Sequence, residues 1–498
     1  MLIFIFLPMK KLSFITFCQF SLVFYATNVV KCISANVSFE ILLPISRKII
    51  IKTREKNMKI KTVEKSYDEV MALPNPKKFK PRRASILFRT LVRVISSIDL
   101  WKARFTHTGK LPPKEEGPFL ILMNHSSFID LKIAHKLIYP RHFGIVCAHD
   151  ALVGKRLLMS LLGCIPTKKF VSDLSLIHNM KHFLDKGINV LMYPEAGYSF
   201  DGRSTVIPEH LGSLVKMLKV PVVYIGTKGA FTRDPLYNEL KVRKVPVSAD
   251  VQYLFTREDV ERLSAAEMDE RIKLAFTFDG FAWQRENGIR VTESFRADGL
   301  ERILYRCAHC EAEGFMKGEG TTLTCEKCGK SYTLTELGEL DAKDGETRFS
   351  HIPDWYEWQR QCVRQELLEE RYTLEVPVDI GIMFDYKALY KVGRGVLSHT
   401  LEGFHLKGCD GKLDYSQKAR SSYGLNADYY WYEIGDVICI GNSQRLYYCF
   451  PPKDVPVAKT RLATEELYKL HQDHEFHLKH CSECDHPAHS ARKAPAAT

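Results

Sequence analysis

The 498-residue sequence has no long internal repeat and no strong low-complexity segment, which argues against a solenoid and against a mainly disordered chain. Acidic residues are fewer than basic ones, 59 against 71, and leave a formal net charge of +12. This excess favours anionic partners such as lipid headgroups, cofactor phosphates or nucleic acid. Hydrophobic residues make up 45% and charged residues 26%, so the length predicts two to four domains with a sizeable core.

Charge is absent from one window near the N-terminus, between Leu12 and Val30. The window is long enough to cross a bilayer, but its polar residues make it a weak span. Three interpretations of residues 1–57 stay open: a signal peptide, a membrane anchor, or upstream sequence before a true start at Met58. Basic residues that follow the window favour a chain that lies on the cytoplasmic face of a membrane.

Cysteine is not scarce, and four of the fourteen form two Cys-x-x-Cys pairs at Cys307, Cys310, Cys325 and Cys328. Such pairs in a long chain indicate a metal site in a reducing compartment rather than a disulfide scaffold. Four thiolates suit a closed structural zinc site, and residues 299–345 resemble a zinc ribbon. The ribbon carries acidic residues and no basic-aromatic stripe, so no nucleic acid is expected as a partner.

Short apolar segments that alternate with helical stretches predict an α/β domain over residues 58–298, with a mostly buried sheet and flanking helices. The expected strands are 118–123, 142–148, 189–193, 220–227 and 247–255, and the expected helices are 152–162, 175–186 and 258–271.

A further helix is predicted over residues 85–105, where apolar residues recur at helical spacing beside Arg89 and Arg93. Such a helix either lies on an anionic membrane or packs on its own domain. The sequence leaves both interpretations open.

The first candidate for chemistry is a polar turn that directly follows an apolar strand and contains Asn124, His125, Ser126 and Asp130. The end of such a strand is where open α/β sheets bind ligands. If a helix begins after the turn, Asp130 lies about one turn on and reaches the His125 ring. The carboxylate would orient the imidazole, whose other nitrogen can then take a proton from a hydroxyl.

A second strand ends in a loop that contains Glu195, Gly197 and Arg203. Glycines let backbone amides approach a phosphate, Arg203 offers a fork of donors, and Glu195 could accept hydrogen bonds from substrate hydroxyls. We therefore expect this loop to bind substrate beside His125.

Together these segments resemble the 1-acylglycerol-3-phosphate acyltransferase (PlsC-type) family over about residues 80–290. Asn124, His125 and Asp130 match the family's first motif in full. The second motif is met at residues 163–169 with Lys168 and Lys169 in place of arginine, and a Val-Pro-Val strand at residues 220–222 matches the fourth. The third motif is met only in part, because Tyr198 stands where the family has arginine.

The resemblance implies acyl transfer from acyl-coenzyme A or acyl carrier protein to the hydroxyl of a lysophospholipid such as 1-acylglycerol-3-phosphate, in phospholipid biosynthesis. His125 would act as the general base with Asp130, and Lys168, Lys169 and Arg203 would hold phosphates. A serine nucleophile at Ser126 is disfavoured because no Gly-x-Ser-x-Gly elbow surrounds it. The alternative function is an idle acyltransferase scaffold that recruits partners.

The last third of the chain is predicted to form a small β-rich domain over residues 346–463, because aromatic and β-branched residues alternate there. Residues 464–498 are expected to form a short helix and a tail rich in His and Cys. The spacing His480-Cys481-x-x-Cys484 in this tail could also bind a metal.

Overall fold

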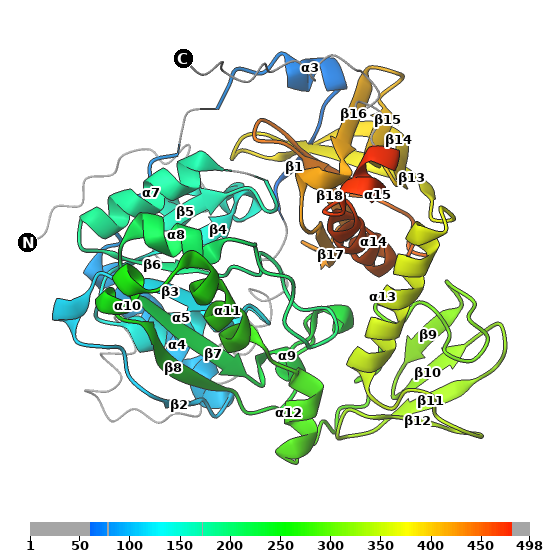
Figure 1. Ribbon diagram of the computed structural model, residues 1–498, viewed down its shortest axis with the longest axis horizontal. Helices are drawn as coiled ribbons and strands as arrows, with labels where there is room; N and C mark the ends of the chain where they lie inside the picture. Colours follow the sequence, from blue (N-terminus) through cyan, green and yellow to red (C-terminus); the bar gives the residue numbers. More distant parts are fainter. Residues whose placement is uncertain (1–59, 77–78, 172, 481–498) are drawn as a thin grey trace, which may run out of the picture. The chain divides into compact units, whose positions relative to one another are not determined.

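A computed structural model describes residues 60–76, 79–171 and 173–480 of the chain (Figure 1). These residues belong to one compact unit. The predictions made for residues 1–57 and for the tail beyond residue 480 lie outside the described residues. None of the helices in the described ranges has the length and apolar character that a bilayer span requires.

A seven-stranded sheet with the order β2-β8-β7-β3-β6-β4-β5 carries the acyltransferase-like motifs (Figure 1). All of its pairings are parallel except β7 with β8. Its strands are β2 (Thr106–Thr108), β3 (Leu120–Met123), β4 (Phe143–Ala148), β5 (Cys164–Thr167), β6 (Asn189–Met192), β7 (Val222–Lys228) and β8 (Ser248–Phe255).

Helices cover both faces of this sheet, and each face has its own hydrophobic cluster. Helices α4 and α5 pack on one face, and α7, α8 and α11 on the other. The helices of this region are α4 (Ile86–Lys102), α5 (Ile129–Ile138), α6 (Arg156–Leu161), α7 (Leu174–Asp185), α8 (Leu211–Leu218), α9 (Ala230–Arg233), α10 (Arg257–Arg262), α11 (Ala265–Phe276) and α12 (Gly280–Glu286). Short 3-10 turns are η1 (Lys114–Glu116), η2 (His149–Leu152), η3 (Leu236–Asn238) and η4 (Leu300–Arg302).

The predicted α/β class is therefore confirmed, with three local differences. The helix expected over residues 258–271 is two helices, because Ser264 accepts a hydrogen bond from the Glu267 amide and caps a new helix there. Only α6 forms within the helix expected over residues 152–162. Strands β2 and β5 were not predicted.

Helix α4 has the opposite orientation to an ordinary amphipathic surface helix. Arg89 is only 2% exposed, whereas Leu87, Val94, Ile98 and Trp101 are between 56% and 80% exposed. These four apolar residues lie on one face of the helix and Arg89 on the opposite face. The domain therefore buries an arginine of α4 and leaves its apolar stripe open to solvent.

The predicted zinc-ribbon segment forms a four-stranded antiparallel sheet of order β12-β11-β10-β9. Its strands are β9 (Met316–Glu319), β10 (Thr322–Cys325), β11 (Ser331–Leu334) and β12 (Leu340–Ala342), and helix α13 (Ile352–Leu368) follows. Buried Trp355 of α13 packs edge-on against Tyr332 of β11, with ring centroids 5.1 Å apart. The ribbon thus shares its core with α13.

The third sheet has the order β16-β15-β14-β13-β19-β18-β17, and β1 (Thr62–Glu64) adds to it by pairing parallel with β14. Its other strands are β13 (Leu374–Met383), β14 (Leu389–Thr400), β15 (Gly403–Gly408), β16 (Leu413–Lys418), β17 (Asn426–Trp431), β18 (Gly435–Gly441) and β19 (Leu446–Phe450). The remaining helices are α3 (Tyr67–Met71), η5 (Ala419–Ser421), α14 (Val457–Leu470) and α15 (His474–Lys479). A β-rich module is present as expected, but it includes residues 62–64, and α14 crosses the boundary expected at residue 463.

Candidate active site

The turn between β3 and α5 brings His125 and Asp130 together. Asp130 lies in the first turn of α5, and its Oδ2 is 3.3 Å from His125 Nδ1. The same oxygen accepts hydrogen bonds from the backbone N–H groups of Ser126, at 2.7 Å, and Ser127, at 2.9 Å. Because Asp130 is fully buried and bonded to this backbone, its position relative to the imidazole is set by the turn itself.

The His125 ring packs against two tyrosines that follow β6. Its centroid is 4.2 Å from that of Tyr193, in a stacked arrangement, and 4.5 Å from that of Tyr198. The side chain stays 25% exposed, and no described residue forms a hydrogen bond to Nε2. The ring is thus held by its Nδ1 edge and its faces, and Nε2 remains available to a substrate.

Asn124, predicted to touch substrate, instead joins β3 to β7. Its Oδ1 accepts hydrogen bonds from the Thr227 amide at 2.7 Å and the Thr227 hydroxyl at 3.0 Å, and its Nδ2 donates to the Thr227 carbonyl at 3.1 Å. The side chain is buried. All of its bonds lie within the sheet, so Asn124 fixes the end of β3 from which His125 projects.

Glu195 also supports the site from behind. Its Oε2 accepts a hydrogen bond from the His125 amide at 2.6 Å, and its Oε1 accepts one from the Thr205 amide at 3.0 Å. Burial raises the pKa of Glu195 to about 7, while the two amide donors act in the opposite direction. The carboxylate predicted to bind substrate hydroxyls is therefore occupied by backbone groups, one of which belongs to His125.

The loop after β6 leaves room beside Gly197. A Cβ added at Gly197 would meet no atom within 4 Å, and the Gly197 amide bonds to the Glu195 carbonyl at 2.7 Å. Gly202 differs, because its φ is +92° and an added Cβ would lie 2.8 Å from the Phe231 ring. Gly197 thus borders open space, whereas Gly202 serves packing, and the role of Gly197 toward a substrate stays a prediction.

Two of the three basic residues predicted to hold phosphate already have protein partners. Arg203 Nε is 3.0 Å from Asp279, and its Nη2 is 2.6 Å from Asp354 of α13. Lys168 Nζ donates to the carbonyl of Ser443, between β18 and β19. These contacts connect the motif loops to the two C-terminal modules.

Lys169 forms no ion pair within the part of the chain that the structure describes. It lies close enough to Asp428 of β17 to act on that carboxyl: burial raises the pKa of Asp428 to about 6, and the Lys169 charge opposes the rise. Among the three basic residues predicted from the motifs, Lys169 is the one without an ion pair in the described residues, and its contact with a substrate phosphate stays a prediction.

Serine catalysis gains no support from the hydroxyls beside His125. Ser127 is fully buried, and its Oγ accepts a hydrogen bond from the Ile129 amide. Ser126 is buried as well, and its amide bonds to Asp130. Both serines shape the turn.

An open groove of about 1060 Å³ begins at the carboxyl end of the sheet. Asn124 and Arg203 line it near the motif loops, and β7, β8, α11 and α12 form the rest. Its apolar lining includes Tyr224, Leu254, Leu274, Phe278 and Trp283. The groove therefore offers an apolar surface next to the residue that precedes His125.

Sequence reasoning missed Tyr193 and Thr227 as parts of this site. Thr227 lies at the end of β7, and its hydroxyl is also 3.3 Å from Asp130 Oδ1. The signal that could have found them was position, because both residues occupy the carboxyl ends of predicted strands next to His125, and Tyr193 also matches the third family motif.

The four predicted zinc ligands lie together. All four sulfur atoms are within 4.8 Å of one another, with Cys307 Sγ 3.8 Å from Cys328 Sγ and Cys310 Sγ 3.7 Å from Cys325 Sγ. Tetrahedral Zn–S bonds of about 2.3 Å require S···S separations of about 3.8 Å. The donor set and its spacing therefore fit a metal ion of this kind.

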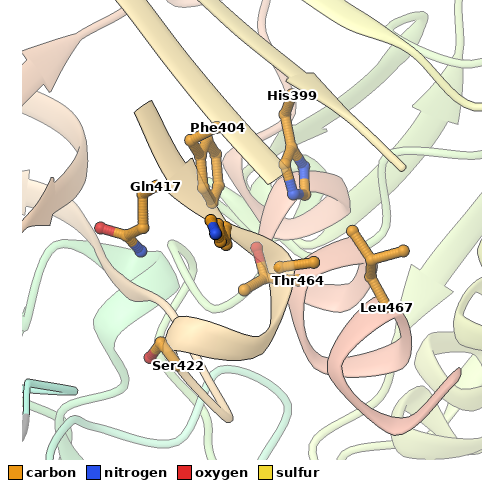
Figure 2. Close-up of a pocket in the computed structure, with 8 residues that line it drawn as sticks. His399, Phe404, Gln417, Ser422, Thr464 and Leu467 are labelled. Carbon is orange, nitrogen blue, oxygen red and sulfur yellow. The ribbon is translucent and has the colours of Figure 1, made fainter. Parts of the chain in front are cut away.

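A small cavity in the C-terminal module shows a different type of environment (Figure 2). His399 stacks on Phe404 with centroids 3.8 Å apart and accepts from or donates to the Tyr372 hydroxyl at 2.9 Å, while Thr464 and Leu467 of α14 face it. Burial lowers the pKa of His399 to about 3, so the ring is neutral. This histidine is a core residue.

Comparison with known proteins identifies the sheet that carries His125. Residues 104–228 match the model of the acyltransferase family. These residues are an acyltransferase domain. A structural likeness also exists to the crystal structure of the 1-acyl-sn-glycerophosphate acyltransferase PlsC from Thermotoga maritima, with 14% identity and a TM-score of 0.29, covering 38% of this chain and 82% of that chain. Among curated proteins, none matches the chain.

Proposed function

We propose that the acyltransferase domain transfers a fatty acyl group from a thioester donor to the hydroxyl of a lysophospholipid, such as 1-acylglycerol-3-phosphate. The observation that carries this proposal is the His125 ring, held through Nδ1 by Asp130 and free at Nε2. Substrate roles for the remaining motif residues are less direct, because Asn124, Glu195 and Arg203 act on the protein itself.

In the proposed reaction the acceptor hydroxyl donates a hydrogen bond to His125 Nε2. The imidazole takes the proton as the oxygen attacks the thioester carbonyl, and general-base assistance of this kind contributes roughly 10² to 10⁴ in rate. The new ester forms as the C–S bond breaks, and the imidazolium returns its proton to the leaving thiolate. Asp130 stabilises the imidazolium between these two steps.

The open groove next to Asn124 suits the acyl chain of the donor. Contact with its apolar residues would remove the fatty chain from water, which is favourable. Coenzyme A and acyl carrier protein both remain candidates for the thiol that carries the acyl group in the donor. We expect Lys169 to meet a phosphate of the donor or of the acceptor, because it forms no ion pair within the described residues.

The experiment that tests the function measures thiol release from palmitoyl-coenzyme A with a panel of lyso-acceptors, including lysophosphatidate. An acceptor-dependent release that disappears in His125→Ala supports the proposal. Absence of acceptor-dependent release in wild type, matched by His125→Ala, would favour the idle scaffold, in which the ribbon and the β-rich module recruit partners.

We also propose that the four cysteines bind one structural zinc ion. A closed Cys₄ site supplies folding energy to a sheet as small as this ribbon and leaves no position for catalysis. Metal analysis of the purified full chain should find one zinc per molecule, and replacement of exposed Cys328 by serine should lower that content. Zinc content unchanged in Cys328→Ser would contradict the assignment.

Association with a membrane surface, on its cytoplasmic face, is part of the same proposal. The exposed apolar stripe of α4 supports it, because Leu87, Val94, Ile98 and Trp101 lie open on one face of a helix next to basic residues. Replacing Leu87 and Trp101 by serine should reduce sedimentation of the protein with phospholipid vesicles. Unchanged sedimentation would remove α4 as the contact.

A further inference from the structure

Arg89 is buried without a carboxylate partner. It is 2% exposed, and its Nη2 donates to the Arg141 carbonyl, but Nε and Nη1 have no hydrogen-bond partner. No ion pair joins Arg89 or Arg141 to an acidic side chain within the described ranges. A guanidinium cannot lose its proton in a protein, so its unmet donors and charge carry a large desolvation cost.

Other unpartnered nitrogens surround Arg89. Arg141 Nη1, His142 Nδ1 and His135 Nε2 are likewise buried and without a hydrogen-bond partner. The Arg89 guanidinium lies 5.5 Å from the Phe143 ring centroid, and the His135 ring lies 5.0 Å from the same ring. The Arg89 charge helps to lower the pKa of both histidines, after burial itself. Four nitrogen-bearing side chains, from α4, from α5 and from the segment that leads into β4, therefore share one neighbourhood.

The neighbourhood also opens to solvent. Arg141 and His142 are only partly buried, and Arg82 and Arg83 on the segment before α4 are exposed. The Arg83 charge acts on both Arg89 and His142. The charges that act on His142, those of Arg89, Arg83 and Lys114, are all positive and would favour an anion on this side.

We propose that Arg89, Arg141 and His142 form a binding site for a phosphate group, at the end of the sheet opposite to His125. Several N–H donors on arginine forks match the tetrahedral oxygens of a phosphate, and the negative charge would offset the buried guanidinium. A water molecule would accept hydrogen bonds but would leave the positive charge uncompensated.

The phosphate could belong to a soluble metabolite or to a lipid headgroup. Arg89 lies on the face of α4 opposite to the exposed apolar stripe, so the position of the site does not by itself select the source. The chemistry is the same in both cases, and the experiment separates them.

The first arm of the test follows thermal unfolding of the full chain in sodium phosphate and in sodium chloride at equal ionic strength. Phosphate should raise Tm, because a ligand that binds only the folded state stabilises it. Arg141→Gln and His142→Gln should reduce this rise, whereas Arg257→Gln, which removes an equal charge from the exposed start of α10, should keep it.

The second arm measures sedimentation with phosphatidylcholine vesicles that contain or lack phosphatidic acid. A lipid source predicts tighter binding to the phosphatidic acid vesicles, weakened about tenfold in Arg141→Gln but not in Arg257→Gln. A soluble source predicts the Tm rise without that difference. The site is excluded if phosphate gives no rise and both arginine variants bind vesicles equally, a result that leaves thiol release at His125 unaffected.

Discussion

At the carboxyl end of the acyltransferase sheet, Asn124, Asp130 and Glu195 each hold at least two hydrogen bonds to neighbouring groups. At the amino end, Arg89 and Arg141 retain buried nitrogens that nothing in the described structure satisfies. The three side chains around His125 are therefore satisfied without a ligand, and His125 Nε2 forms no hydrogen bond to a described residue. The Tyr193 hydroxyl beside the ring and Asp234 Oδ1 are the buried polar atoms of this end that lack a partner in the described structure. The amino end requires a further group to offset its charge. A catalytic site can thus be preorganised by internal bonds, whereas a binding site can be recognised by the bonds it lacks.

The largest effect is expected from His125→Ala, which removes the proposed general base at the carboxyl end of the sheet. Turnover should fall by roughly 10² to 10⁴ because general-base assistance is lost. Thiol release and thermal unfolding measured together would check this, since the fold should be retained. The exposed His178→Ala on α7 is the matched control and should keep wild-type turnover. Equal losses in both variants would contradict the special role of His125.

Asn124 and Asn189 allow the two ends to be compared with the same chemical change. Asn189 accepts a hydrogen bond from the Phe119 amide and donates to the His142 carbonyl, as Asn124 does with Thr227. Either alanine variant leaves buried backbone groups unpaired, so each should lower the free energy of unfolding by about 1–3 kcal/mol. Only Asn124→Ala should also reduce turnover per folded molecule. Equal turnover in the two variants would contradict the prediction that only the carboxyl end of the sheet supports catalysis.

Glu195, which supports His125, should make the free energy of unfolding of the protein depend on pH. Burial raises its pKa from 4.5 to about 7, so the folded state binds a proton between these values that the unfolded state has lost. Stability from this group therefore falls as pH rises from about 4.5 to 7, with a slope of at most about 1.4 kcal/mol per pH unit. The difference in Tm between wild type and Glu195→Gln should change across this window. A constant difference would show that the carboxyl does not titrate there.

Arg203→Gln should have the smallest effect. Both of its ion pairs are partly exposed, so their loss should cost no more than about 1 kcal/mol. If Arg203 only joins the β6 loop to α12 and α13, the KM for lysophosphatidate should not change. A tenfold rise in KM with unchanged Tm would instead support the phosphate-binding role that the sequence predicts for Arg203.

Local features of the acyltransferase domain were readable from the sequence, and long-range pairings were not. The strand before Asn124 was visible as an apolar run, and the contact of His125 with Asp130 depends on residues five apart at the start of a helix. β5 was missed because it is short and contains Pro166, and β2 because its Thr-His-Thr residues are polar and exposed.

The roles of the basic residues depended on partners far along the chain. Arg203 meets Asp354, 151 residues away, and Lys168 meets Ser443, 275 residues away. A free basic side chain and one already paired look the same in a sequence. The same reason applies to Arg89, whose burial follows from the packing of α4 on α5 and not from its helical position.

The parallel pairing of β1 with β14 means that the chain enters its last module before it builds the acyltransferase domain. Residues 62–64 complete a sheet whose other strands begin at residue 374, so the acyltransferase domain, the ribbon and α13 all lie between the first strand of that sheet and the rest. A fragment that starts after the ribbon would expose the edge of β14 that β1 covers, and such an open edge invites pairing between molecules. Separate expression of the C-terminal module will therefore need residues 60–71 restored, for example by circular permutation.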